Sequence, residues 1–136
     1  MSPETTAQPR LKLGVMASLP HGPEVELQKA HELGLPTCQM ACWQPDLLND
    51  EIANRLVAAS REYQVEVTTI WAGGPGRNVW DFIEGPTTIG LVPPDMRAER
   101  VATLKRAADF AVKVGVPTIT THVGFIPESP SDPLYA

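Results

Sequence analysis

Cysteine is scarce in this sequence: Cys38 and Cys42 are the only two, and they stand four positions apart. In an extended segment this spacing separates their Cα atoms by roughly 13 Å, which is too far for a disulfide bond. The spacing also differs from that of a zinc knuckle. We therefore expect two packed thiols in a reducing compartment.

Long apolar runs and an excess of basic residues are also lacking. No apolar stretch approaches the roughly 20 residues of a membrane span. The start of the chain, MSPETTAQPRLKL, has no apolar core of the kind found in signal peptides. The formal net charge is −5, whereas a nucleic-acid-binding surface needs a basic face. These absences predict a cytoplasmic protein without membrane or nucleic-acid partners.

The composition that remains is typical of a folded domain. Of the 136 residues, 43% are hydrophobic and 20% are charged, so the chain can bury a substantial core. Residues 1–10 are polar and contain two prolines, which predicts a flexible N-terminal arm.

From residue 11 onward, strand-like runs alternate with helical patterns. Predicted strands cover residues 11–17, 37–43, 65–72 and 116–123, and predicted helices cover residues 23–34, 47–63 and 95–115. Gly34 and Gly115 are expected to end the first and third helices, and Asp95 to cap the third. Two apolar stripes are expected to face the core: Ile52, Leu56, Ala59 and Tyr63, then Leu104, Ala108 and Ala111 with Val114 or Val112.

Strands that alternate with helices predict a parallel α/β sheet, which closes either as a doubly wound sheet or as a (β/α)₈ barrel. A dinucleotide-binding sheet needs GxGxxG after its first strand, and here that turn reads ASLPHGPE. The glycine cluster GGPGR at 73–77 follows the third strand and leads into a long loop, so it is a phosphate-loop candidate or simply a turn. Both closures remain open.

In either closure, ligands bind beyond the carboxyl ends of the strands. The residues at these ends are Ser18 to His21, Cys42 to Gln44, Trp71 to Gly73, and His122 to Gly124. The alternation of side chains along a strand predicts which positions face inward and which face the helices. The expected inward positions are Thr118, Thr120, His122, Gln39, Ala41 and Trp43, and the positions expected against the helices are Cys38, Met40 and Cys42.

Three segments together resemble the sugar phosphate isomerase/epimerase group: IWAGGPG, WDFIEGPTTIGLVPPDMRAER and THVGFIPE. These are the xylose-isomerase-like TIM barrels, which also include enzymes of the endonuclease IV type. The resemblance runs from about residue 11 to the end. It implies an α/β (β/α)₈ barrel of which residues 11–136 are the N-terminal half, with four βα units.

The same resemblance implies a divalent metal, such as Mn, Zn, Mg or Co. In that group two glutamates, an aspartate and a histidine from the fifth to eighth strands hold the metal, and the glutamates serve as acid and base. We therefore expect the ligands to come mainly from a C-terminal half. The chain is then a truncated piece, or a half-barrel that forms a homo-oligomer or pairs with another half.

The reaction implied is proton transfer next to the carbonyl of a sugar or sugar phosphate. In that group the fourth strand ends in a His-x-Gly that faces the active centre. The match with residues 122–124 implies that His122 is a catalytic residue, or a ligand of a second metal. Without the resemblance it is a hydrogen-bonded structural histidine. Gly124 would let the chain turn without a side chain.

Other residues are expected to bind substrate. Trp43 and Trp71 form an apolar wall for a sugar ring, or else they plug the barrel end. His21 in the first loop is a possible contact, and Glu128 reaches the rim or is a solvated acid. The loop 73–94 is expected to act as a lid anchored by Trp80, Asp81 and Phe82, and Arg77 or Arg97 to meet a phosphate or to be surface charges.

Two other functions are open. An endonuclease IV-like phosphodiesterase would need a basic DNA-binding face and more histidines at strand ends, and this sequence has three histidines in all. A non-catalytic half-barrel that acts in assembly or sugar binding needs neither feature.

Overall fold

The computed structural model describes residues 11–135, so the predicted N-terminal arm lies outside the described residues. One parallel sheet contains the strands β1 (Gly14–Ser18), β2 (Thr37–Cys42), β3 (Glu66–Ala72) and β4 (Ile119–Thr120). The helices are α1 (Pro23–Glu32), α2 (Asp50–Tyr63), α3 (Gly85–Thr88) and α4 (Pro94–Val114), with single 3₁₀ turns at Leu19–His21 and Pro45–Leu47.

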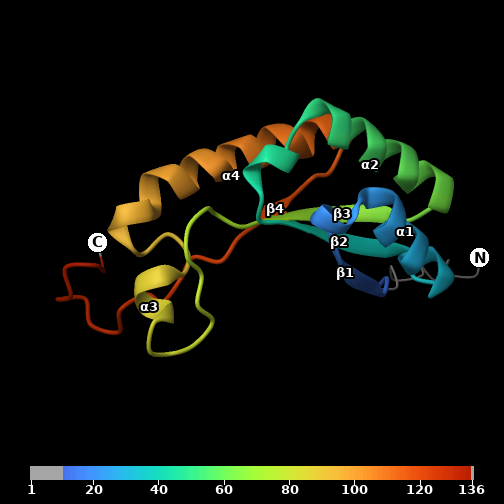
Figure 1. Cartoon of the computed structure of the whole chain (residues 1–136). Coiled ribbons are helices and arrows are strands. Elements are labelled where there is room, and N and C mark those ends of the chain that lie inside the picture. The colour runs from blue at the N-terminus through green and yellow to red at the C-terminus, as the bar shows by residue number, and fades with distance from the viewer. Residues whose placement is uncertain (1–10, 136) are drawn as a thin grey trace, which may run out of the picture.

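The strand order distinguishes the two closures. Neighbouring strands follow each other in sequence, β1-β2-β3-β4, and every pair is parallel. The helices α1, α2 and α4 lie on one side of the sheet (Figure 1). A doubly wound sheet reverses its strand order and carries helices on both faces, whereas a barrel wall does neither. The fold is therefore the half-barrel that the sequence resemblance implied.

The side of the sheet that faces the helices, here the covered face, holds the core. As predicted, Cys38, Met40 and Cys42 are buried there, while Gln39 is exposed on the opposite, open face. The larger buried side chains that pack with these residues are Leu19, Leu27, Leu56, Val65, Ile70 and Phe110. Burial of such aliphatic and aromatic area supplies most of the stability of a domain of this kind.

The two buried thiols are free, as predicted. Burial raises the pKa of the Cys38 thiol to about 11 and also raises the pKa of Cys42, whose Sγ donates to the carbonyl oxygen of Gln44. Both side chains are therefore protonated packing groups at neutral pH rather than nucleophiles.

The second predicted helix is confirmed, although it begins three residues later than expected. The side chain of Asn49 accepts a hydrogen bond from the backbone N–H of Ile52 at 3.0 Å, which fixes the start of α2 at Asp50. Of the predicted stripe, Ile52, Leu56 and Ala59 are buried and Tyr63 is half-buried.

One expectation for the third helix is wrong, and another holds only in part. Pro93 is the N-cap of α4 and Pro94 its first residue, so Asp95 lies in the first turn instead of capping it. Of the predicted stripe, Ala111 is buried and Val114 packs against the core, whereas Leu104 and Ala108 are only half-buried and Val112 is 81% exposed. The buried positions are Arg100, Thr103, Ala107, Phe110 and Ala111. Two of these are polar, which is why apolar periodicity alone placed part of the stripe one position away.

The fourth strand is much shorter than the predicted 116–123. Only Ile119 and Thr120 pair with β3, because Pro117 has no N–H to donate and the chain leaves β3 after Thr120. His122 therefore follows the strand rather than ending it. The carbonyl oxygen of Val123 instead accepts hydrogen bonds from the N–H groups of Leu91 (2.6 Å) and Val92 (3.2 Å) in the preceding loop.

The remaining differences are small. The first strand begins at Gly14 instead of residue 11, and Leu11 and Leu13 are 100% and 77% exposed. The predicted loop 73–94 contains the short helix α3. Within residues 11–135, no helix combines the length and the apolar character needed to cross a membrane.

Candidate functional site

Four ring side chains gather at the carboxyl ends of β2, β3 and β4, and we call them the aromatic cluster: Trp43, Trp71, Trp80 and His122. The ring centroids of Trp43 and Trp71 are 5.6 Å apart, and those of Trp43 and Trp80 are 5.8 Å apart. The Trp80 and His122 rings are 4.8 Å apart at an interplanar angle of 87°. All these contacts are edge to face, the arrangement that aromatic quadrupoles favour.

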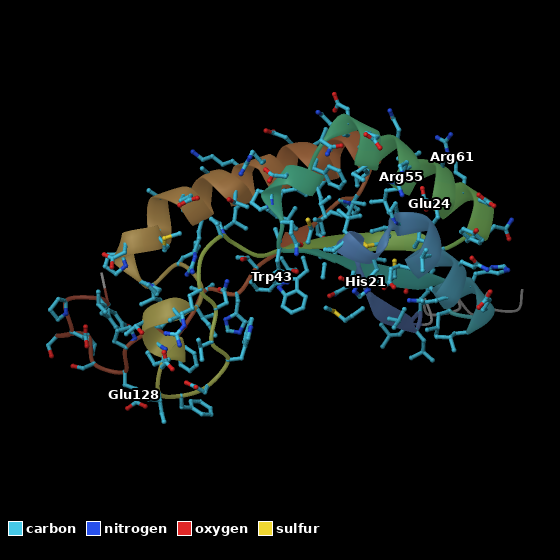
Figure 2. The ribbon with its side chains drawn as sticks, viewed as in Figure 1. His21, Glu24, Trp43, Arg55, Arg61 and Glu128 are labelled. Atoms are coloured by element: carbon cyan, nitrogen blue, oxygen red, sulfur yellow. The ribbon has the colours of Figure 1, made fainter. Side chains whose placement is uncertain are left out.

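The strand register places the cluster on the open face. Ala41, Trp71 and Thr120 are partners across β2, β3 and β4, and Trp43 and His122 follow two residues later on their segments. Figure 2 shows the Trp43 side chain projecting from the sheet on the side away from α2 and α4. Trp43 and Trp71 are half-buried, Trp80 is 56% exposed and His122 is exposed, so a ligand can reach the rings.

The first glycine of GGPG makes room for Trp43. A Cβ on Gly73 would lie 1.7 Å from Cε3 of Trp43. The Gly73 N–H donates to the carbonyl oxygen of Cys42 at 3.0 Å, which continues the pairing of β2 and β3 for one more step. This glycine cluster is thus a turn out of a strand that accommodates an indole ring, the second of the two readings that its sequence allowed.

A compact turn presents Trp80 to the cluster. Oδ1 of Asp81 accepts hydrogen bonds from the N–H groups of Ile83 (2.9 Å) and Glu84 (2.7 Å), and α3 follows directly. These backbone hydrogen bonds, the one from Glu84 foremost, hold the pKa of the Asp81 carboxyl below its ordinary value. The sequence marked Trp80 as an anchor of the loop, but its place beside His122 became evident only from the tertiary structure.

Two glycines let the segment after His122 pack against the loop, backbone to backbone. Gly124 has a φ of +107°, and a Cβ there would lie 2.4 Å from the carbonyl oxygen of Ile89. Gly90 has a φ of +76°, and a Cβ there would lie 2.2 Å from the carbonyl carbon of Val123. The expectation that Gly124 must lack a side chain is confirmed, and the reason is this contact.

The arginines considered for phosphate binding contact the protein itself. Arg77 forms an ion pair with Glu84. The guanidinium of Arg97 donates to the carbonyl oxygens of Leu91 and Val92, each at 2.7 Å. Both side chains therefore bind groups within the 73–94 loop.

His21 and Glu128 lie away from each other. His21 is exposed in the 3₁₀ turn after β1, and its Nδ1 is 3.4 Å from Oε1 of Glu26. In Figure 2, Glu128 lies on the C-terminal segment, far from both His21 and Trp43. The structure therefore brings Trp43, Trp71 and His122 together and leaves Glu128 outside their cluster.

The carboxylate of Glu26 is the most enclosed acidic group near β1. Burial alone would raise its pKa, but hydrogen bonds from Lys29 and from the N–H of Ser18 outweigh that cost, and the pKa is lowered. These donors lie at 2.8 and 2.9 Å. Glu26 thus stays ionised and ties the end of β1 to α1.

The described residues do not fit the metal site that the family implies. Within residues 11–135, no three side chains of histidine, cysteine, aspartate or glutamate come close enough together to hold a metal ion. His122 has the indole of Trp80 beside it, and a single imidazole is not a metal site.

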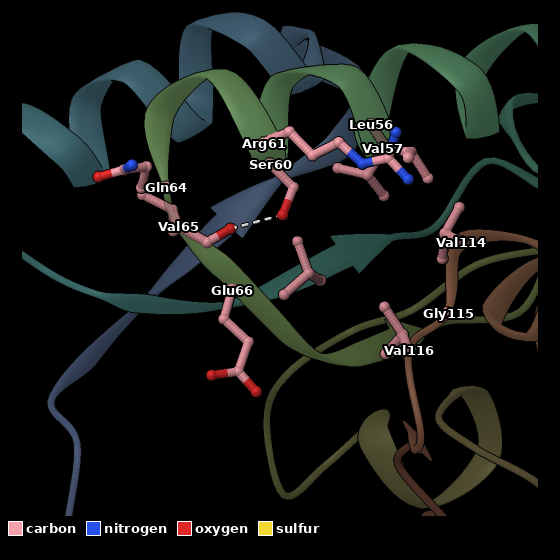
Figure 3. A pocket seen from close by; sticks show the side chains of 11 residues that line it. Leu56, Val57, Ser60, Arg61, Gln64, Val65, Glu66, Val114, Gly115 and Val116 are labelled. Atoms are coloured by element: carbon pink, nitrogen blue, oxygen red, sulfur yellow. Dashed lines mark hydrogen bonds between the residues drawn. The ribbon is translucent and has the colours of Figure 1, made fainter.

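A groove of about 400 Å³ lies at the other end of the sheet, between α2, the start of β3 and the end of α4. Figure 3 shows its lining, including Arg61, Glu66 and Val116, and the hydrogen bond of 2.7 Å from Oγ of Ser60 to the carbonyl oxygen of Val65. Because ligand sites of barrels lie at the carboxyl ends of the strands, this groove is not the candidate site.

Known structures share the fold. No protein-family model matches the sequence, and no curated protein sequence matches it. A xylose isomerase domain protein from Planctomyces limnophilus aligns with a TM-score of 0.82 and 38% identity, over 93% of this chain and 45% of that chain.

Two more distant structures show the fold alone. The 3-keto-D-glucoside 4-epimerase YcjR from E. coli aligns with a TM-score of 0.55 and 21% identity, over 81% of this chain and 37% of that chain. A D-psicose 3-epimerase crystallised in the presence of D-fructose aligns with a TM-score of 0.58 and 16% identity, over 90% of this chain and 41% of that chain.

The fold and the site thus define a parallel half-barrel with an aromatic cluster at the carboxyl ends of its strands. The chain shares the fold of the xylose-isomerase-like TIM barrels, the group that its sequence resembles. It spans less than half the length of each of the three solved chains.

Proposed function

We propose that this chain is the substrate-binding half of a sugar isomerase or epimerase. The observation that carries the proposal is the aromatic cluster at the carboxyl ends of the strands. The sequence of the chain is 38% identical to that of a xylose isomerase domain protein with the same fold. This is the place where barrels bind their ligands. Half-buried indoles are suited to the apolar C–H face of a sugar ring.

Each member of the cluster has a proposed role. Trp43 and Trp71 form the wall on which the ring lies, and Trp80 covers it from the loop. The exposed imidazole of His122 hydrogen-bonds a sugar hydroxyl, and His21 on the neighbouring rim binds a more distant part of the substrate. Glu128 has no proposed contact with the cluster, because it lies far from Trp43 (Figure 2).

The arginine contacts favour a neutral sugar over a sugar phosphate. A phosphate site needs donors that are free to bind it. The Arg97 guanidinium donates to two backbone carbonyls, and Arg77 pairs with Glu84. We therefore expect an aldose or ketose without phosphate to bind better than its phosphate ester.

The acid–base step is proposed to need a second half-barrel. Proton transfer next to a carbonyl requires a base and an acid within hydrogen-bond reach of the reacting carbons. The aromatic cluster supplies one imidazole, so this half binds and orients the sugar. The carboxylates and the divalent metal would come from a C-terminal half or a second copy, in the reducing cytoplasm that the free thiols favour.

Sugar binding tests the proposal directly. The 136-residue chain is titrated with D-fructose, D-xylose and D-fructose 6-phosphate while the indole N–H resonances are followed by NMR. We expect D-fructose or D-xylose to shift the indole signals with a Kd on the order of millimolar. Trp43→Leu should abolish the shifts, whereas the matched control Phe82→Leu, which changes an aromatic residue outside the cluster, should leave them unchanged.

Three outcomes separate the alternatives. Indole signals that stay unmoved by any of these sugars would contradict the proposal. Binding without turnover is expected for this half alone. Turnover by the isolated chain would show that the acid–base groups lie within it. The solution mass and the bound divalent metal of the same sample would then show whether a dimer forms the catalytic centre.

A further inference from the structure

Arg100 on α4 is a buried cation that is bonded to backbone alone. It is 3% exposed. Its Nε donates to the carbonyl oxygen of Pro75 at 3.1 Å, Nη1 donates to that of Gly90 at 2.6 Å, and Nη2 donates to that of Arg77 at 3.3 Å. One guanidinium therefore links the first residues of the 73–94 loop to Gly90 near its end.

Burying this charge is costly, and the cost indicates a specific role. A charged group taken out of water destabilises the fold unless strong hydrogen bonds offset the loss. Burial is the main influence on the guanidinium and lowers its pKa. Aliphatic side chains fill such positions at lower cost, but the planar fork of arginine can bond several carbonyls at once.

The loop backbone is shaped around this side chain. A Cβ on Gly74 would lie 2.3 Å from Cγ of Arg100. Gly76 has a φ of +91°, which favours glycine, and a Cβ there would come closest to Cε of Met96, at 3.0 Å. Two glycines of GGPG thus make room for neighbouring side chains, Gly73 for Trp43 and Gly74 for Arg100.

The linked loop holds His122 from two directions. Trp80, near the middle of the loop, places its ring 4.8 Å from the His122 ring. Gly90, at the end of the loop, packs against the carbonyl of Val123, the residue after His122. We propose that Arg100 is a positioning residue: by fixing both ends of the loop it sets the contact between Trp80 and His122. That this contact serves a sugar rests on the proposed function.

The contact can be measured without any sugar. The Trp80 ring should shift the NMR resonances of the His122 ring protons by its ring current, and Trp80→Leu defines complete loss of that shift. Arg100→Lys keeps the charge but not the fork, so we expect most of the shift to disappear. In Arg100→Lys the backbone amides of residues 76–84 should also exchange their hydrogens with solvent roughly tenfold faster than in the wild-type chain, because the loop opens locally more often. Arg106→Lys, an exposed arginine of the same helix, is the matched control.

A second variant keeps the test decisive if Arg100→Lys fails to fold. Gly74→Ala leaves the arginine in place but sets a methyl group against its Cγ, and the same loss of the His122 shift is expected. A folded variant of either kind that retains the wild-type shift and the wild-type exchange would overturn the proposal. If both variants lose the shift while the wild-type chain binds no sugar, the role of Arg100 stands and the proposed function fails.

Discussion

The two faces of the sheet differ sharply although the same strands build both. Met40 on the covered face is completely buried, whereas Met16 on the open face is 50% exposed. The covered face contains aliphatic residues and thiols that pack against helices. The open face contains tryptophans, threonines and an imidazole at its carboxyl end. Stability and candidate chemistry are therefore separated by the alternation of side chains along each strand.

The open face also indicates what completes the fold. Parallel sheets are normally covered on both sides, and in a closed barrel the inward side chains fill the interior. The exposure of Met16 and Gln39 is that of a barrel wall without its opposite half. A second half-barrel is therefore part of the function we propose.

The largest difference in stability between variants of the two faces is expected from a pair of methionine substitutions. Met40→Ala should lower the free energy of unfolding by about 2–5 kcal/mol, because it leaves a cavity in the packed core. Met16→Ala should change it by about 0.5 kcal/mol or less, since the side chain is already half in water. Urea denaturation followed by circular dichroism measures both, and equal losses would show that the open face is buried in solution.

The backbone contact at the carboxyl end of the open face can be isolated with two glycines. Gly90 and Gly34 both have positive φ values, of +76° and +68°, so alanine is strained at either position. At Gly34 an added Cβ meets no atom within 4 Å, whereas at Gly90 it meets Val123 at 2.2 Å. Gly90→Ala should therefore cost about 1–3 kcal/mol more than Gly34→Ala in urea denaturation. A similar cost for both would mean that the segment after β4 shifts freely.

The hydrogen bonds between β3 and the segment that leads into β4 are expected to contribute less to stability than the contact at Gly90. Oγ1 of Thr118 donates to the carbonyl oxygen of Thr68 at 2.9 Å and contacts Oγ1 of Thr69 at 2.7 Å. Thr118→Val removes these hydrogen bonds and should lower the free energy of unfolding by about 1 kcal/mol. Thr120→Val, at an exposed position of β4, is the control and should have a smaller effect.

The smallest effect on stability is expected from removing an ion pair on the outer surface of the helices. Arg55 on α2 makes two hydrogen bonds of 2.8 Å to the carboxylate of Glu24 on α1. The hydrogen bonds from Arg55 are the main cause of the lowered pKa of Glu24. Both side chains are about two-fifths exposed, so solvent and salt screen the pair.

The direction of its pH dependence follows from the lowered pKa of Glu24. A carboxyl group with a lower pKa in the folded state stabilises the fold above its unfolded pKa, and this contribution is lost as the pH falls through the folded value. Arg55→Met should therefore destabilise less than Thr118→Val at pH 7, by progressively less as the pH falls below the ordinary pKa of glutamate, and not measurably in 1 M salt. A loss that is independent of pH and salt would show that the packing of the arginine stem, not its charge, holds α1 to α2.

Much of the site was predictable from local sequence. The positions of Trp43, Trp71 and His122 at or just after the strand ends follow from counting residues along alternating strands and helices. Trp80 was harder to place, because a loop of this length has no periodicity from which its path can be deduced. Arg100 was not predicted at all, since a single arginine in a helical pattern is indistinguishable from a surface charge.

The sequence by itself determined the alternation of strands and helices, the covered face with its two thiols, and the resemblance to the xylose-isomerase-like barrels, because these depend on local periodicity and short motifs. Only the tertiary structure decided the barrel-type strand order, the early end of β4 and the packing of the 89–92 segment against Val123. It also decided which residues meet in the aromatic cluster. These features depend on contacts between residues far apart in the chain, and no local pattern encodes such contacts.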